Sequence, residues 1–419
     1  MREMAQIEPA TPVLPSRRRP LYALVSANFI SNIGNGITGL AIPWFVLEST
    51  GSASRTGVTA FFALLPMVIA AAFGGALVDR IGNKRMSIVA DLASALTVAL
   101  IPALYHTIGL PFWALLALVF LGAILDTPGN TARRAMMPDL AELGDMPLER
   151  ANGFSESASA LSGLVGPALA GLLIVMLGPS NVLYLDAATF VVSSLLVFLL
   201  VPSLREAQES GAKYLDDVKS GMRFLRSDRL LMTIMLFSAV ANFVAAPIGA
   251  VLLPVFVQET FGSAGKLGIL ISALGAGSLA GALLFGAIGP RLPRRPTLLI
   301  AVIMIGPPFI LFAAVNHLLP GIVLMAIAGI ALGAIGPLMA TVQAERIPAE
   351  LRGRVFGAMM AVGMCASPLG VLIAGPATEW IGVQAMFVIT GGSLVLMGLV
   401  LALQPALKEM ERDPALEAA

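Results

Sequence analysis

Four acidic residues lie within long apolar runs of this sequence: Asp91, Asp126, Glu156 and Asp186. Removing water from a carboxylate favours its neutral, protonated form, unless a cation or hydrogen-bond donors stabilise the charge. Each of the four is therefore a candidate for exchanging protons, and the structural alternative is a buried ion pair or a helix cap. Arg133 and Arg134 follow Asp126 by about two turns and could pair with an acid in this region. Asp186 lies within about a turn of an expected helix start, where caps are common.

A second set of polar residues lies in the first apolar run. Asn28, Asn32 and Asn35 are spaced at i, i+4 and i+7 and share one helical face, with Ser31 beside them. Because a polar stripe is costly against lipid, this face is expected to meet protein or a cavity that binds substrate. Asn242 sits in a similar context, and amides from both halves are candidates to line the cavity. The alternative is interhelical hydrogen bonding, worth roughly 1 kcal/mol per bond.

The composition shows which elements must carry these residues. Of 419 residues, 57% are hydrophobic and 12% are charged. A soluble protein needs more polar side chains to cover its surface, whereas a bilayer solvates apolar side chains and requires backbone hydrogen bonds to be made within helices. We therefore expect an all-α membrane protein. The net charge of +1 argues against nucleic acid as a partner, and the single Cys365 permits neither an intramolecular disulfide nor a thiolate metal cluster.

Twelve apolar runs reach about 20 residues, the length that crosses a bilayer. These transmembrane helices are expected at 21–47, 57–78, 86–105, 112–132, 151–177, 182–202, 230–257, 267–289, 297–315, 321–342, 355–377 and 385–404. With a cytoplasmic N-terminus, all but two of the 26 lysines and arginines fall on the cytoplasmic side, the exceptions being Arg55 and Lys266. Both termini are predicted to be cytoplasmic. Trp44, Trp113 and Trp380 then lie near outer helix ends, as interfacial tryptophans do.

The sequence repeats itself at an offset of 211 residues. The stretch from Pro43 to Ala53 resembles that from Pro254 to Ala264, and further pairs keep the register: Gly57 and Gly268, Gly75 and Gly286, Arg80 and Arg291, Gly122 and Gly333. We expect two pseudo-symmetric six-helix bundles, at 21–202 and 230–404. A cytoplasmic linker with an amphipathic helix, 203–229, joins them, and the cytoplasmic tails are 1–20 and 405–419. Two parallel six-helix halves are one architecture for alternating access.

The loop "GGALVDRIGNKR" between the second and third spans concentrates charge between apolar runs. Gly75 and Gly82 allow close approach and a tight turn, and three basic side chains favour the cytoplasmic side: Arg80, Lys84 and Arg85. Asp79 lies where the second span ends, and a carboxylate there suits a reversible contact with the N-terminus of another helix. Pro290 takes its place in the second copy, so that the two loops are not equivalent.

These residues resemble the loop signature of the major facilitator superfamily. Other stretches resemble its bacterial drug-exporter branch, which includes macrolide and siderophore exporters: Asp126-Thr-Pro128-Gly, Met137-Pro138-Asp139, Glu149-Arg150-Ala151-Asn152, Leu185-Asp186-Ala187, Gly221-Met-Arg223-Phe224 and Arg352-Gly353-Arg354-Val355. The resemblance covers essentially the whole chain. It implies two rocking halves, with the loop acting as a cytoplasmic gate that bonds the C-terminal half in one access state. Our candidate partners for Asp79 are Arg354 and the start of the eleventh span.

A glycine and proline pattern in the fifth span is similar to the antiporter signature of the superfamily's exporters: Gly163, Gly166, Pro167 and Gly171. Small residues at this spacing let helices approach closely, and plain close packing is the alternative explanation. Related exporters often carry aspartate where this chain has Asn35. This difference shifts the expected coupling role to Asp126 and Glu156.

The sequence therefore predicts a secondary active transporter that exports small amphipathic or lipophilic compounds, such as drugs, antibiotics or siderophore-like metabolites, by proton antiport across the plasma membrane. No ATP-binding loop is present, His106 and His317 lie far apart in the sequence, and we expect no enzyme activity, cofactor or metal. Partners are the substrate, protons and the bilayer, and a monomer suffices. The alternatives are lysophospholipid or sugar transport, a membrane sensor or scaffold that does not transport, and a channel.

Overall fold

A computed structural model describes residues 17–203 and 214–411, with only the backbone described for 71–76, 79, 214–219 and 349. The described chain is almost wholly helical, and it holds twelve helical spans long and apolar enough to cross a membrane. The predicted all-α membrane fold is therefore confirmed. Most of the predicted tails, 1–20 and 405–419, and residues 204–213 of the predicted linker lie outside the described residues.

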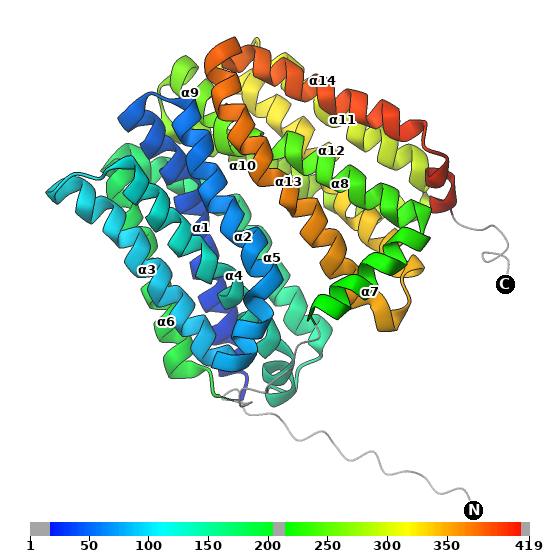
Figure 1. The fold of residues 1–419 in the computed structure, drawn as a ribbon, viewed down its shortest axis with the longest axis horizontal. Helices are drawn as coiled ribbons and strands as arrows, with labels where there is room; N and C mark the ends of the chain where they lie inside the picture. Colours follow the sequence, from blue (N-terminus) through cyan, green and yellow to red (C-terminus); the bar gives the residue numbers. More distant parts are fainter. Residues whose placement is uncertain (1–16, 204–213, 412–419) are drawn as a thin grey trace, which may run out of the picture.

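Two groups of six spans make up the two halves (Figure 1). The N-terminal half consists of α1 (Arg19–Thr50), α2 (Ala53–Ile81), α3 (Asn83–Thr107), α4 (Phe112–Leu143), α5 (Leu148–Leu177) and α6 (Pro179–Leu200). The C-terminal half consists of α8 (Arg229–Pro247) with η2 (Ile248–Leu252) and α9 (Leu253–Phe261), then α10 (Ala264–Ile288), α11 (Arg294–Phe312), α12 (Leu318–Arg346), α13 (Arg352–Ile381) and α14 (Val383–Ala402). Between them, α7 (Tyr214–Ser227) packs on α13.

The seventh span changes helix type in its middle. The π-helical turns of η2 separate α8 from α9, and prolines lie at both sides of this segment, Pro247 and Pro254. Because proline has no N–H to donate to the carbonyl four residues earlier, the ladder is interrupted and a wider turn takes its place.

The turns show the internal repeat directly. Gly51 ends α1 with φ +65° and Gly262 ends α9 with φ +60°, and both lie in the left-handed region that favours glycine. Gly82 joins α2 to α3 with φ +88°, as the predicted tight turn requires. We call the end of the bundle that holds Gly51 and Gly262 the outer end, and the end that holds Gly82 and α7 the inner end, after their predicted sides.

The register of the repeat shifts within the third span of each half. Because α3 has 25 residues and α11 has 19, helices after this point no longer match at 211. Gly122 and Gly333 illustrate the change: a methyl group on Gly122 would meet Thr97 of α3, whereas one on Gly333 would meet Ser278 of α10. The predicted equivalence of these two glycines is therefore wrong.

The two halves contact each other along two helix pairs, α2 with α13 and α5 with α10, which we call the seams. In each seam the helices cross at glycines, which let the two backbones approach closely. A methyl group on Gly375 of α13 would lie 2.7 Å from the Ala53 carbonyl oxygen of α2. In the other seam, a methyl group on Gly171 of α5 would lie 2.7 Å from the Ala264 carbonyl oxygen of α10. Both crossings lie toward the outer end, and Figure 1 shows α2 and α13 diverging from there toward the inner end.

A cluster of ion pairs ties the inner end of the C-terminal half together. The Arg294 guanidinium bonds both Glu345 oxygens, at 2.6 and 2.7 Å, and thereby joins α11 to α12. Arg346 Nε donates to Asp228 Oδ2 at 2.7 Å, and Arg346 also pairs with Glu409 in the short helix η5 (Pro405–Met410). These contacts join the inner ends of α8, α11, α12 and η5 to one another, so that the four helices form one rigid unit.

The three tryptophans do not share one environment. Trp113 and Trp380 are 73% and 88% exposed, as expected of interfacial side chains. Trp44 is only 5% exposed and donates from Nε1 to Glu48 Oε2 at 3.0 Å. Trp44 lies six residues before the end of α1, near the outer end as predicted, but its side chain packs inside the bundle and does not have the exposure expected at an interface.

Candidate functional site

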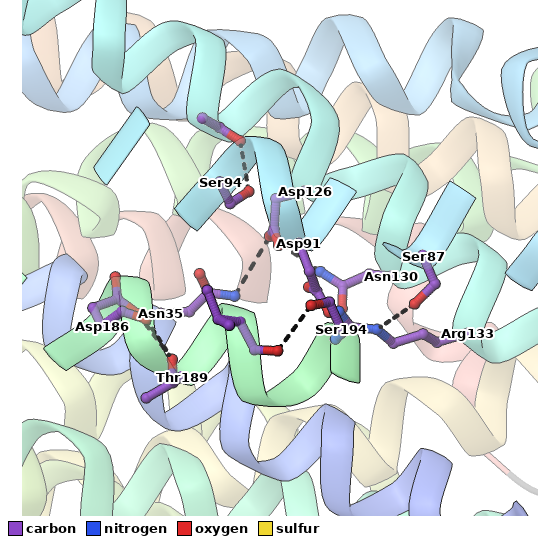
Figure 2. A network of polar contacts seen from close by, with 12 residues as sticks. Asn35, Ser87, Asp91, Ser94, Asp126, Asn130, Arg133, Asp186, Thr189 and Ser194 are labelled. Carbon is purple, nitrogen blue, oxygen red and sulfur yellow. Dashed lines mark hydrogen bonds and ion pairs between the residues drawn. The ribbon is translucent and has the colours of Figure 1, made fainter. Parts of the chain in front are cut away.

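A polar network crosses the middle of the N-terminal half (Figure 2). Four helices supply its members: Asn35 and Thr38 of α1, Ser87 and Asp91 of α3, Asp126, Asn130 and Arg133 of α4, and Asp186 and Thr189 of α6. Three of the four acidic residues singled out in the sequence thus belong to one network.

Asp91 and Arg133 form an ion pair inside the bundle. Both side chains are nearly inaccessible, at 2% and 4% exposure, and Arg133 Nε also donates to Ser87 Oγ at 3.1 Å. Gly129 permits this pairing, because a methyl group there would lie 2.6 Å from Ala90 Cβ on α3. Arg133 was expected to pair with an acid in this region, and Figure 2 shows that its partner is Asp91 on the neighbouring helix.

Asp126 is half-buried and is held by amides. Asn130 Nδ2 donates to Asp126 Oδ2 at 3.1 Å from one turn along α4, and Asn35 Nδ2 approaches the same oxygen at 3.5 Å from α1. No ion pair joins Asp126 to another of the described residues, since Arg133 is bound to Asp91. Asp126 is therefore a carboxyl group that has hydrogen-bond donors but no bound cation.

Asp186 is fully buried between α6 and α1. Thr38 donates to Oδ2, and Thr189 Oγ1 donates to Oδ1 at 3.2 Å. Gly34 makes room for this contact, because a methyl group on it would lie 2.1 Å from Asp186 Oδ1 and from Thr189 Oγ1. Asp186 lies seven residues after Pro179, the first residue of α6, so the suggestion that it caps this helix is wrong.

The charges of this network do not balance when every acid is ionised. Three carboxyl groups accompany one guanidinium group, and that guanidinium is bound to one of the three. A carboxylate in a low-dielectric interior must be paired, hydrogen-bonded or neutralised by a proton. Asp126 and Asp186 rely on neutral donors, so a proton on either group reduces the electrostatic cost of the network.

Glu156 differs from the other three acids because its side chain is exposed. The expectation that it is buried is wrong. Gly163 and Pro167 follow it by seven and eleven residues on α5 and therefore share its face. Further along this face, a methyl group on Gly268 of α10 would lie 2.4 Å from the Pro167 carbonyl oxygen. Glu156 thus belongs to the face that meets the opposite half, at a level where the halves have parted.

The amides of the predicted cavity divide into two groups. Asn28 and Asn32 are half-buried, like Asn35, whereas Ser31 is 0% exposed and is not available to a solute. Ser31 is therefore wrongly placed in the predicted cavity lining. Asn242 is exposed on α8, where its side chain donates to the Ser238 carbonyl oxygen at 2.9 Å.

The predicted gate loop makes contacts within its own half. Lys84 Nζ donates to the Phe198 carbonyl oxygen of α6 at 2.9 Å, which places a cation on the last turn of that helix. Arg80 and Arg85 are exposed. The side chains at two gate positions, Gly75 and Asp79, lie outside the described part of the chain.

Arg354, the proposed partner of Asp79, lies in the first turn of α13 beneath α7. A methyl group on Gly221 of α7 would lie 2.5 Å from the Arg354 carbonyl oxygen. The linker helix therefore packs directly on the backbone of the proposed gate partner.

The glycines of the fifth span make two different contacts. Gly171 packs on α10 of the opposite half, and Gly166 packs within its own half, where a methyl group on Gly36 would lie 3.3 Å from its Cα. Gly163 has open space at its Cβ position. The pattern thus joins α5 to both halves, and Pro167 lies between the two contacts.

Several network residues were missed in the sequence. Thr38, Asn130 and Thr189 each lie three or four residues from a residue that had been singled out, so they share a helical face with Asn35, Asp126 and Asp186 in turn. That spacing would have found them. Nothing in the sequence indicates that Gly34 packs on Asp186, because the contact joins α1 to α6 across 152 positions.

The whole chain resembles known transport proteins. The profile of a family described as transmembrane secretion effector matches residues 10–418. The chain belongs to this secretion effector family. The multidrug efflux pump Tap of Mycolicibacterium fortuitum is 34% identical to the chain over 402 residues, which cover 94% of the chain and 98% of Tap.

Two further similarities extend this assignment. Macrolide efflux protein A of Streptococcus pyogenes, 26% identical, matches over 388 residues that cover 90% of this chain and 94% of that protein. A mutant of the nucleoside transporter NupG has a fold similar to this chain, with a TM-score of 0.77 at 14% identity, covering 94% of this chain and 100% of NupG. Membership of the secretion effector family thus identifies the chain as a multi-pass membrane transporter of the major facilitator superfamily, and the acidic network lies in the core of its N-terminal half.

Proposed function

We propose that this transporter exports small amphipathic or lipophilic compounds, such as drugs, antibiotics or siderophore-like metabolites, in exchange for protons. Export is supported by the relatives, which are named multidrug and macrolide efflux proteins. The observation that carries proton coupling is Asp126, a half-buried carboxyl group without an ion-pair partner among the described residues. It is the most accessible acid of the network.

A proton on Asp126 changes how α1 and α4 are joined. Hydrogen bonds to a carboxylate are roughly twice as strong as those to a neutral acceptor. When Asp126 is ionised it accepts strong hydrogen bonds from Asn35 of α1 and Asn130 of α4, and when it is protonated these hydrogen bonds weaken. Substrate and proton then compete for the polar groups of one region, which is the requirement for exchange. Asp186 and the Asp91–Arg133 pair fix the surrounding helices.

Alternating access follows from rocking of the two halves. The described contacts between α5 and α10 extend from the glycine crossing near the outer end to the Ser272–Leu164 hydrogen bond near the middle of α5, and those between α2 and α13 include the crossing near the outer end, which suits a state that is open at the inner end. When the inner end closes, Asp79 binds the start of α13 near Arg354. The second copy, with Pro290, makes no such ion pair. The protein lies in the plasma membrane with both termini in the cytoplasm, which the distribution of lysine and arginine supports.

The test of the function is efflux from cells that overproduce the protein. A panel of dyes and antibiotics is measured with and without a proton uncoupler, for the wild type, Asp126→Asn and the control Asp145→Asn. Asp145 is an exposed acid of the α4–α5 loop and undergoes the same chemical change. We expect uncoupler-sensitive efflux in the wild type and control, and near-background efflux for Asp126→Asn. Unchanged coupled efflux in Asp126→Asn contradicts the assignment.

If no compound of the panel moves while folded protein is present in the membrane, the multidrug range is wrong and a narrow metabolite exporter takes its place.

The gate has a separate test. Asp79→Asn is expected to slow efflux by weakening the inner-closed state, with Asp145→Asn again as the control. Equal efflux rates and equal populations of the access states in Asp79→Asn and the wild type would remove Asp79 from the gate.

A further inference from the structure

One acid at the outer end bonds across the seam between the halves. Glu379, in the last turn of α13, accepts hydrogen bonds from Ser52 Oγ at 2.6 Å and from the Ser54 backbone N–H at 2.9 Å. The Ser54 hydroxyl donates to its other oxygen. Both serines belong to the start of α2, so a single carboxylate of the C-terminal half collects three donors from the N-terminal half.

The start of α2 has a physical need for such a group. The first N–H groups of a helix lack intrahelical acceptors and carry partial positive charge, which favours a carboxylate nearby. The first turn of α2 contains no acid of its own. Ser52 Oγ accepts from Arg55 N–H at 3.1 Å as the helix cap, and its own hydroxyl proton is directed to Glu379. Glu379 therefore completes the capping of a helix in the opposite half.

The glycine crossing places the carboxylate at this distance. Gly375 lies one turn before Glu379 on α13, and a methyl group there would lie 3.0 Å from Ser54 Cα. Gly57 on α2 faces the same crossing, with a methyl position 2.6 Å from the Val371 carbonyl oxygen. Because the two backbones touch here, the bonds to Glu379 form only when α2 and α13 are in contact.

The other seam is the internal control that the repeat supplies. Its crossing pairs Gly171 with Gly268, and the residue one turn after Gly171 is Val175, in the position that Glu379 occupies on α13. A methyl group on Gly265, the counterpart of Ser54, would lie 3.4 Å from a Val175 methyl carbon. Ser263, the counterpart of Ser52, makes no side-chain cap hydrogen bond. The same backbone crossing is therefore polar in one seam and apolar in the other.

We infer that Glu379 is a latch that holds the outer end closed, and that it positions the halves for transport by setting the balance between outer-closed and outer-open states. The inference rests on the proposed alternating access. Opening the outer end separates Glu379 from both serines and leaves the α2 N-terminus with the Ser52 cap alone, whereas in the described α5–α10 seam the side-chain bond that opening strains is a neutral one, from Ser272 Oγ to the Leu164 carbonyl oxygen at 3.0 Å. The α2–α13 seam therefore resists opening more strongly than the α5–α10 seam.

The test measures the outer distance between the halves in the purified protein in lipid nanodiscs. Cys365, the only cysteine, is replaced by alanine. Spin labels are placed at Ile108→Cys and Leu319→Cys, which are exposed positions at the outer ends of α3 and α12. Distance distributions are recorded for the wild type, Glu379→Ala, Glu379→Gln and Ser54→Ala. The control is Glu48→Gln, an exposed outer-end acid whose bond from Trp44 stays within α1.

If Glu379 is a latch, its removal should increase the fraction of molecules that show the longer distance between the two labels. The ratio of outer-open to outer-closed molecules should rise about tenfold in Glu379→Ala, as expected for loss of hydrogen bonds to a charged group. Smaller increases are expected for Glu379→Gln and Ser54→Ala, and none for Glu48→Gln. A distribution for Glu379→Ala that matches the wild type overturns the latch, and if that variant does not fold, matching distributions for Glu379→Gln and Ser54→Ala do so. Because the labels report opening without substrate, this result is independent of whether any tested compound is exported.

Discussion

The two halves of the molecule share their turns and their glycine crossings, yet they keep their charges in different places. In the N-terminal half, Asp91, Asp126, Arg133 and Asp186 lie in the middle of the spans. In the C-terminal half, the charged side chains of the spans lie near helix ends, as in the Arg294–Glu345 pair at the inner end. The N-terminal half thus has ionisable side chains in its core, and the C-terminal half has an apolar core with ion pairs at the ends of its helices.

This difference separates two tasks that a transporter must perform. Proton exchange requires carboxyl groups away from bulk water, and the N-terminal half provides them. Rocking requires that each half move as a body, and the ion pairs of the C-terminal half join α11, α12 and η5 without placing charge in its core. Variants that move or remove charge in one half should therefore have effects that the matching change in the other half lacks.

The largest effect is expected from Arg133→Gln. Removing one partner of a buried ion pair leaves the other charge uncompensated, at a cost of about 3–5 kcal/mol. The thermal unfolding temperature in detergent should fall strongly, and Asp91→Asn combined with Arg133→Gln should recover most of the loss. A single variant as stable as the wild type would show that Asp91 does not carry a charge that Arg133 balances.

A smaller effect is expected from Gly34→Ala. The added methyl group would collide with Asp186 and Thr189, and overpacking of this kind costs about 1–3 kcal/mol. Gly39→Ala is the matched control on the same helix, since no heavy atom lies within 4 Å of its methyl position. We expect a lower unfolding temperature and reduced efflux for Gly34→Ala only. Equal losses in both variants would point to a general effect on α1.

The smallest effect is expected from Glu345→Gln in the C-terminal half. The Glu345 side chain is 55% exposed whereas that of Arg294 is 10% exposed, so water screens only the carboxylate, and the pair should contribute about 1 kcal/mol, the upper end of the range for exposed pairs. Unfolding temperature should drop slightly, and efflux should remain as sensitive to the uncoupler as in the wild type. Loss of coupling in Glu345→Gln would mean that the C-terminal half takes part in proton exchange, and the contrast between the halves would then fail.

The sequence was sufficient for the features that depend on local pattern. The positions of the spans follow from apolar runs, although α4 continues to Leu143, 11 residues beyond the predicted end at 132, and the turns at Gly51 and Gly262 follow from the repeat. Contacts across helices were harder to predict. Arg133 lies two turns from Asp126 along the chain, yet its ion pair is with Asp91 on the next helix. Spacing along one helix identifies which side chains share a face, but not which neighbouring helix that face meets.

Burial was the other property that the sequence could not supply. Glu156 and Asp186 both lie in apolar runs, but one is exposed and the other is inaccessible. The difference arises from the crossing of α5 with α10 and from the packing of Gly34 on α6, which are properties of the assembled bundle. For the same reason Glu379 gave no signal: it is a single acid at a helix end until α2 lies against it.

The glycine crossings also determine how far the inner end can move. Gly171 lies 23 residues from Leu148, the first residue of α5, and this length of helix spans roughly 35 Å. While the outer end is closed, the α5 and α10 backbones stay in contact at this crossing, and α5 can tilt about it. A tilt of about 10° at the crossing would displace the far end by roughly 6 Å, about the width of a small aromatic ring. A larger side chain in place of Gly171 would restrict this movement without altering any group that binds a proton or a substrate.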